Sequence, residues 1–175
     1  MNKTNKITFC AVMAALASVT MLISHTMYLT YAVPAMAGLF VMIAVIEITP
    51  KWAFATYVAS AFPIFLLAEN ESKMLYIMFF GYYPIIKSFV EKLRKPVLEW
   101  ILKFLVFNIA VIVTYLLLTV VFDMSLDDFG EFGKYGAWIF LALGNVVFVF
   151  YDIAVSRMSM FYFDIIRPKF KFFRK

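Results

Sequence analysis

The sequence has few charged residues, almost no cysteine or histidine, and none of the short motifs that mark the common enzyme classes. Its single cysteine, Cys10, excludes an internal disulfide bond and a cysteine metal cluster, and its single histidine, His25, excludes a histidine metal cluster. No GxxxxGK[ST] stretch occurs, which excludes ATP hydrolysis by a phosphate-binding loop. A GxSxG elbow and a serine, histidine and aspartate set at a shared depth are also missing. We therefore predict a protein that is not an enzyme and that uses no metal or other cofactor.

Apolar residues dominate what is present. They make up 65 % of the 175 residues, whereas Asp, Glu, Lys and Arg together make up 15 %, far from the usage of soluble domains. This composition predicts an integral membrane protein. In such a chain the net charge of +5 does not indicate nucleic-acid binding, because the position of the charges along the chain carries the information.

Six apolar runs follow one another, and each is about long enough to cross a hydrocarbon core about 30 Å thick. We predict an all-α integral membrane protein whose residues 1–175 form a single bundle of six transmembrane helices, with a basic and aromatic cytoplasmic tail at 158–175. The predicted spans are about 7–23, 32–48, 52–68, 74–90, 97–122 and 135–157. The first run is interpreted as a retained helix and not as a cleaved signal, because further apolar runs follow it.

The charges between the runs predict the orientation of the bundle. Cytoplasmic loops of membrane proteins carry an excess of Lys and Arg. With a cytoplasmic N-terminus, the inner segments hold Lys3, Lys6, Lys51, Lys92, Arg94, Lys95, Arg157, Arg167, Lys169, Lys171, Arg174 and Lys175. The outer loops hold Lys73 and Lys134 together with Glu69, Glu71, Asp123, Asp127, Asp128 and Glu131. Every loop agrees in sign, so we predict a multi-pass protein with both termini cytoplasmic.

The fourth run is the least regular of the predicted helices. Gly81 and Pro84 lie three residues apart near its middle, and Lys87 follows them. A glycine and a proline at this spacing loosen the backbone hydrogen bonding, which a membrane helix tolerates only where neighbouring groups satisfy the freed atoms. We therefore expect this helix to be buried within the bundle.

The first run carries small residues at helical spacing. Ala11 and Ala15 are four residues apart, and so are Ala14 and Ser18. Small residues at this spacing let another helix backbone approach closely in a membrane. Two interpretations stay open: packing against a helix of the same chain, or a docking face for a second protein.

A first set of polar residues lies within about two turns of the predicted cytoplasmic helix ends. One interpretation is that long side chains reach the headgroups while a few ion pairs form, such as Asp152 with Lys87. The other is a proton or ion relay. The set comprises Glu47, Lys87, Glu91, Glu99, Lys103 and Asp152.

A second set forms stripes on the last three predicted helices. Because residues seven apart share a helix face, each stripe is expected to face one neighbour. The stripes are Trp138, Asn145 and Asp152 on the sixth helix, Asn108, Tyr115 and Thr119 on the fifth, and Tyr76, Phe79 or Phe80, and Tyr83 on the fourth. Converging stripes would enclose an outward-opening pocket with aromatic walls and two amides, suited to a flat small molecule. Alternatively, the asparagines bond each other or a backbone carbonyl across helices. Both interpretations stay open.

The size of the chain, the six spans, the cytoplasmic ends and the first-helix stretch AVMAALA, with its AxxxA pattern at Ala11 and Ala15, resemble the substrate-binding S components of energy-coupling factor (ECF) transporters. The resemblance implies a bacterial plasma-membrane protein that captures a vitamin-like molecule from outside. It also implies docking through helix 1 on a coupling membrane subunit powered by two separate cytosolic ATPases, with Ala11, Ala14, Ala15 and Ser18 at the contact.

Position within this layout predicts the substrate-binding residues. They are Tyr76, Tyr83, Asn108, Trp138 and Asn145, with Tyr28 and Tyr31 of the first loop as a lid.

Two other functions compete with this one. The first is a non-enzymatic membrane scaffold resembling the rod-shape-determining D-type cell-shape proteins, which predicts stable protein partners and no small ligand. The second is a self-contained channel or secondary carrier, against which the lack of internal repeats and of a mid-membrane acid counts.

Overall fold

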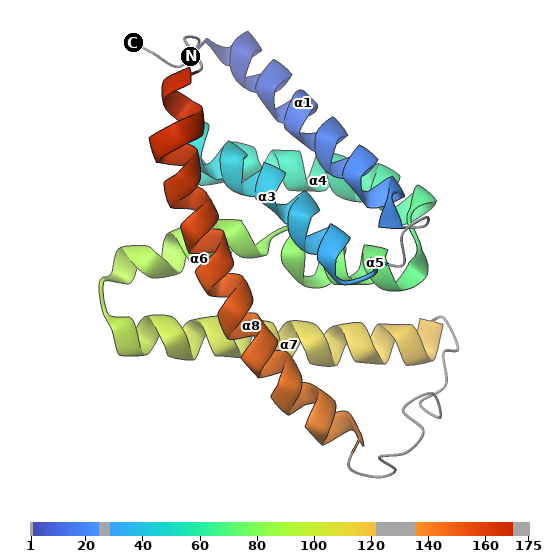
Figure 1. Ribbon diagram of the computed structural model, residues 1–175. Helices are drawn as coiled ribbons and strands as arrows, with labels where there is room; N and C mark the ends of the chain where they lie inside the picture. The colour runs from blue at the N-terminus through green and yellow to red at the C-terminus, as the bar shows by residue number, and fades with distance from the viewer. Residues whose placement is uncertain (1, 25–28, 122–135, 170–175) are drawn as a thin grey trace.

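A computed structural model describes residues 2–24, 29–121 and 136–169, and every regular element in this part of the chain is helical (Figure 1). The helices follow the order of the six apolar runs, and the fourth run is divided into several short elements. The elements are α1 (Lys3–Leu22), α3 (Ala32–Glu47), α4 (Pro50–Leu67), α5 (Asn70–Leu75), η1 (Tyr76–Phe80), α6 (Tyr83–Val90), η2 (Glu91–Leu93), α7 (Pro96–Val121), α8 (Gly136–Phe161), η4 (Tyr162–Ile166) and η5 (Arg167–Lys169).

Three of these helices are long and apolar enough to cross a membrane. They cover Lys3–Leu22, Pro96–Leu117 and Leu141–Ile166, and Ala32–Glu47 is a shorter apolar helix. This finding supports the predicted membrane protein. The helix that contains the sixth run continues past the predicted end of its span at Arg157, into η4 and η5.

Proline begins several of the helices. Pro50 occupies the first turn of α4, Pro84 that of α6, and Pro96 is the first residue of α7. Proline is tolerated at this position because the backbone N–H it lacks would have no intrahelical partner there. The prolines therefore divide the apolar sequence into separate helices.

The fourth predicted span is interrupted where its glycine and proline lie. The π-helical turn η1 ends with the N–H of Gly81 donating to the carbonyl of Tyr76 at 2.8 Å, and α6 starts two residues later. Tyr57 of α4 donates its hydroxyl to the carbonyl of Ile77 at 2.7 Å, so a neighbouring helix satisfies one of the irregular backbone groups. The expected irregularity and the burial of this helix are both confirmed, since Tyr76, Phe79, Tyr83 and Ile85 are buried.

Helix α3 packs closely against the other elements. Its Gly38 lies so near η1 that a Cβ atom there would come within 2.4 Å of the carbonyl oxygen of Phe80. On the other side, α1 packs against α3 and α4 through the buried residues Cys10, Ala14, Ala17 and Met21. Small residues thus allow close helix approach on both sides of α3.

Candidate functional site

Several buried polar side chains gather between α6, α7 and α8. Asn145, Phe148, Asp152 and Val155 follow one another on α8 at intervals of three and four, so they share one face of the helix. This face meets α7 and α6 in three successive layers: an amide pair, an aromatic cluster and an ion network. The predicted stripe on the sixth helix is therefore a packing seam.

The amide layer joins α7 to α8. Nδ2 of Asn108 donates to Oδ1 of Asn145 at 2.9 Å, and Nδ2 of Asn145 donates back to Oδ1 of Asn108 at 3.1 Å. Each amide also donates to a carbonyl of its own helix, at Phe104 and Leu141, both at 2.8 Å. Both N–H donors of each amide and one lone pair of its oxygen are therefore used.

The aromatic layer fills the space where a pocket was predicted. The rings of Phe107 and Phe148 stack with centroids 4.7 Å apart. Phe79 of η1 meets both edge-on, with its centroid 5.2 Å from that of Phe107 and 5.8 Å from that of Phe148. Tyr83 also lies against Phe148, at 5.5 Å. Offset and edge-on pairs of this kind stabilise a packed core, and here they bring α7, α8 and η1 together.

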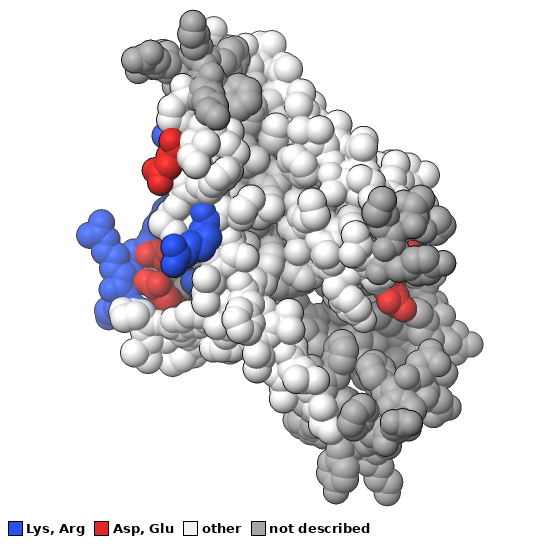
Figure 2. Space-filling model, in the orientation of Figure 1, with Lys and Arg blue, Asp and Glu red and all other residues white. Residues whose placement is uncertain are grey.

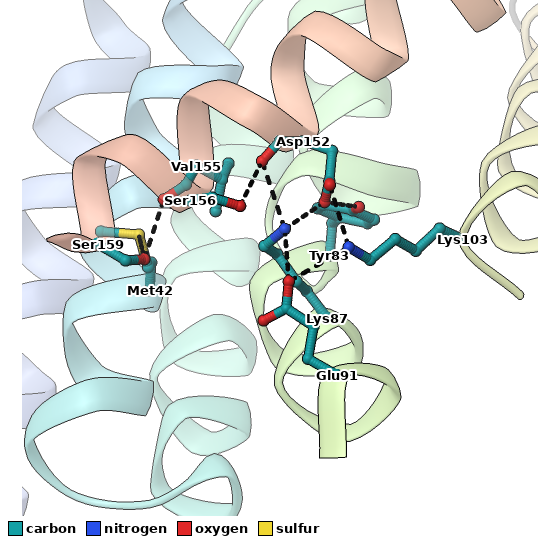
Figure 3. A network of polar contacts seen from close by, with 9 residues as sticks. All are labelled: Met42, Tyr83, Lys87, Glu91, Lys103, Asp152, Val155, Ser156 and Ser159. Carbon is teal, nitrogen blue, oxygen red and sulfur yellow. Dashed lines mark hydrogen bonds and ion pairs between the residues drawn. The ribbon is translucent and has the colours of Figure 1, made fainter. Parts of the chain in front are cut away.

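The ion network surrounds Asp152, which is 4 % exposed. Its Oδ1 accepts hydrogen bonds from Lys87 Nζ and, at 2.5 Å, from the Tyr83 hydroxyl, and its Oδ2 accepts from Lys103 Nζ at 3.0 Å (Figure 3). Both lysines also pair with Oε1 of Glu91, at 2.9 Å from Lys87 and 3.2 Å from Lys103. Two ammonium groups and two carboxylates thus form a closed, neutral cluster.

This cluster agrees with the first interpretation of the charged residues near the predicted cytoplasmic helix ends, in which some of them form ion pairs. The predicted pair between Asp152 and Lys87 is confirmed. Buried charges persist only when they are paired and hydrogen-bonded, and all of the cluster's charged groups are. Glu91, whose side chain is 45 % exposed, is the part of the cluster that meets the surroundings.

A second ion pair joins α3 to η5. The side chain of Glu47 is 1 % exposed, and its Oε1 lies 3.1 Å from Nε of Arg167, which is 43 % exposed. Among the predicted inner charges, Glu47 therefore has its own partner, apart from the network at Asp152.

The predicted tyrosines of the fourth span do not meet at one site. Tyr76 is buried, and its hydroxyl lies 2.7 Å from Oγ of Ser60 on α4. Tyr83 contacts the ion network instead, and Tyr31 is 61 % exposed before α3. Tyr28 and the side chain of Trp138 lie outside the described residues. The structure therefore brings Asn108 and Asn145 together but separates Tyr76 and Tyr31 from them.

The four predicted docking residues lie on two sides of α1. Ala14 is buried against the neighbouring helices, whereas Ala11 and Ala15 are exposed and Ser18 is half-buried. Ser18 donates its hydroxyl to the carbonyl of Ala14 at 2.9 Å. The pair Ala14 and Ser18 thus partly packs within the chain, whereas the pair Ala11 and Ala15 lies on the surface.

Tyr151 is a candidate that the sequence stripes did not identify. Its hydroxyl is buried and has no hydrogen-bond partner in the described part of the chain. Its ring lies 4.8 Å from that of Phe80 and 5.6 Å from that of Tyr83. A buried hydroxyl without a partner is costly, so this group is available to a ligand or a water molecule. Its place next to Asp152 in the sequence was the only available signal.

Comparison with known proteins gives no relative for this chain: no protein-family model matches it, and no match was found among curated proteins or among solved structures.

Proposed function

We propose that this chain is the membrane-embedded, substrate-binding subunit of an ECF-type importer. It has six spans and cytoplasmic termini, captures a vitamin-like molecule from outside, and docks through α1 on a coupling subunit driven by separate ATPases. The observation that carries the proposal is the exposed pair of small residues, Ala11 and Ala15, on a helix whose other side is packed against α3 and α4.

The exposed surface of α1 has two different halves. At 100° per residue, Ala11 and Ala15 fall on one side of it, and the larger Val12, Leu16 and Val19 fall on the other. Another helix backbone can approach closely at Ala11 and Ala15, before the larger Leu22 on the same side. Because both alanines are exposed, a partner can reach this half without any change in the chain's own packing.

The distribution of charge supports the proposed orientation. Figure 2 shows Lys and Arg, mixed with acids, along one side of the molecule, where α6 ends and α7 begins, and acidic atoms on the opposite side in the region of α5. The positive-inside bias assigns the first side to the cytoplasm. In the view of Figure 1 the start of α1 and the end of η5 lie at the same end of the molecule, which agrees with an even number of spans.

The proposed substrate site lies at the amide pair and the aromatic layer. A polar-edged ring system would replace the mutual hydrogen bonds of Asn108 and Asn145 and stack on the neighbouring aromatic side chains. The hydroxyl of Tyr151 has no partner among the described residues and lies beside Gly38 of α3, so it would bind a part of the ligand that reaches past the aromatic layer. Tyr76, Tyr83 and Trp138, with Tyr28 and Tyr31 as a lid, complete the proposed set.

Native mass spectrometry of the detergent-purified protein tests substrate capture directly. The protein is transferred intact to the gas phase, and any released small molecule is then identified by its mass after denaturation. We expect one vitamin-sized compound per chain. An empty protein that also shows no thermal stabilisation across a vitamin panel would overturn the proposal.

The Tyr151→Phe variant separates a ligand contact from a packing role. If the hydroxyl binds the ligand, its removal weakens ligand binding while the ligand-free protein unfolds at the same or a higher temperature, because an unpaired buried hydroxyl has been removed. Binding that is unchanged in this variant would remove Tyr151 from the site.

The docking step is tested with three substitutions on α1. Ala11→Trp and Ala15→Trp should abolish uptake in cells that supply the coupling subunits, because the indole ring prevents close helix approach, while ligand binding stays intact. Leu16→Trp is the matched control, since it places the same ring on the other exposed half of α1, and it should leave uptake unchanged. Equal uptake in all three variants would contradict docking through the small-residue edge.

The membrane scaffold remains the second candidate, and a specific observation favours it. Asn108 and Asn145 already satisfy each other, and aromatic rings fill the space beside them, as a protein without a ligand requires. A scaffold predicts co-purification with stable protein partners in place of a small molecule. The same mass spectrometry experiment therefore distinguishes the two functions.

A further inference from the structure

An apolar groove runs between α3 and the carboxyl-terminal part of α8 with η4. It holds about 220 Å³ and is partly open to the surroundings. Its walls include Met36 and Ile43 of α3, Met158 and Phe161 of α8, and Tyr162 and Ile166 of η4. A groove with walls of this kind does not retain water, because water needs polar partners. It suits a hydrocarbon chain.

Charged side chains lie at one end of the groove. Arg167 directly follows the lining residue Ile166, and its Nε is held 3.1 Å from the buried carboxylate of Glu47. The ring of Phe163 lies 5.4 Å from the guanidinium carbon. A guanidinium has five N–H donors, and among the described residues Oε1 of Glu47 accepts no hydrogen bond, so the contact with Arg167 is an ion pair alone; the Arg167 side chain is 43 % exposed. Glu47 and Phe163 thus orient Arg167 while donors remain for another anion.

We infer that a phospholipid of the basic-side leaflet binds here, with an acyl chain in the groove and its phosphate on Arg167. A guanidinium matches a phosphate by two parallel hydrogen bonds, and such charge-assisted bonds are the stronger class. An apolar groove that ends at an oriented cation is complementary to an amphiphilic anion, whose apolar chain fills the groove and whose charge pairs with the cation. Free phosphate would contact only the cation and would leave the groove empty. This inference requires a membrane around the chain, but it holds for an importer and for a scaffold alike.

Native mass spectrometry with dioleoylphosphatidylglycerol as the added lipid tests the inference. The wild type should retain one phospholipid per chain. Ile43→Trp fills the groove while Glu47 and Arg167 keep their charges, and it should lower lipid occupancy about tenfold at equal lipid concentration, as loss of the groove contact would require. Arg157→Gln removes an exposed charge of α8 and is the control, with occupancy expected to stay as in the wild type.

The charge pair needs a double substitution, because loss of Arg167 alone leaves Glu47 buried without its ion pair. Glu47→Gln together with Arg167→Gln should lower occupancy about tenfold, the change expected for one charged hydrogen-bonding partner. Glu47→Gln alone keeps the arginine and should retain the lipid.

Equal occupancy in all variants would overturn the inference. Retention of glycerol phosphate as strong as that of the full lipid would also overturn it, since the groove would then play no part. So would a second copy of the chain in place of the lipid, seen as a dimer that the Ile43→Trp substitution dissociates.

Discussion

Asp152 lies at the centre of the ion network between α6, α7 and α8. It accepts hydrogen bonds from side chains of α6 and α7, so one carboxylate ties three helices together. Asp152→Asn would leave Lys87 and Lys103 buried with only the half-exposed Glu91 as an anion. Breaking a buried ion pair on one side costs about 3–5 kcal/mol. We expect a large fall in the thermal unfolding midpoint of the purified protein.

Glu91→Gln is the matched control for Asp152→Asn. It removes the other carboxylate of the same cluster, but this side chain is 45 % exposed, so solvent screens it. The expected cost is about 0–1 kcal/mol, typical of an exposed ion pair. If both variants unfold at the same temperature, Asp152 does not have the central role that its contacts indicate.

The amide pair leads to a second prediction at this scale. Asn145→Leu removes both hydrogen bonds between the two amide groups, and Asn108 keeps its bond to the carbonyl of Phe104. An interhelical hydrogen bond in a membrane is worth on the order of 1 kcal/mol. The ligand-free protein should therefore lose about 1–3 kcal/mol of stability, since one N–H and the oxygen of the partly buried Asn108 amide are also left without a partner.

Comparison of stability with and without ligand decides what the pair is for. The double variant Asn108→Leu with Asn145→Leu should be more stable than either single variant, because no lone amide remains. If Asn145→Leu lowers the stability of the ligand-bound protein more than that of the ligand-free protein, the substrate contact is supported. A change confined to the ligand-free protein favours a role in helix packing alone.

At the scale of the element, the contact between α3 and η1 is the tightest constraint. A methyl group on Gly38 would lie 2.4 Å from the carbonyl oxygen of Phe80, and a backbone atom cannot rotate away. Gly38→Ala should therefore force the two elements apart at a cost of about 1–3 kcal/mol. Thermal unfolding of the purified protein measures this effect.

Gly144→Ala provides the comparison for Gly38→Ala. The new methyl group in α8 would lie 3.4 Å from a ring atom of Phe107, which is ordinary contact, and alanine favours the helix by about 1 kcal/mol over glycine. We expect unchanged or higher stability. A loss of similar size in both variants would show that the close approach at Gly38 does not decide the result, because the new methyl group at Gly144 makes only ordinary contacts.

The sequence predicted the elements better than their contacts. Gly81 and Pro84 marked the interruption of the fourth span because both act on the local backbone. The pair of Lys87 with Asp152 followed from shared depth and opposite charge. Lys103 shares that depth, but whether it faces Asp152 depends on how α7 is rotated, which spacing within one helix does not determine.

The pocket was predicted from spacing within single helices, which does not determine the contacts between helices. Spacing by seven placed Asn145 and Asp152 on one face of α8, and the structure has both on the seam. The stripe omitted Phe148, which lies between them, and Phe107 on α7. These rings fill the gap that the stripes would enclose. Which large side chains interlock across helices is a property of three-dimensional packing, and the pattern of one helix does not contain it.

At the scale of the whole molecule, the six proposed spans make a prediction that does not depend on ligand or partner. Asn70 at the start of α5 and Lys95 before α7 are both exposed, and one proposed span lies between them. The positive-inside bias assigns Lys95 to the cytoplasm and Asn70 to the outside. The two positions should therefore meet different solvents in an intact cell.

The chain offers a convenient way to measure this, because Cys10 is its only cysteine and lies buried. In a Cys10→Ala background, Asn70→Cys should react with a membrane-impermeant maleimide in intact cells, whereas Lys95→Cys should react only after the membrane is permeabilised. Cys10→Ala alone gives the background. If Lys95→Cys is labelled in intact cells and Asn70→Cys is not, the orientation is reversed. If both are labelled, no span separates them, and the six-span bundle, the outward-facing substrate site and the cytoplasmic ends fall together.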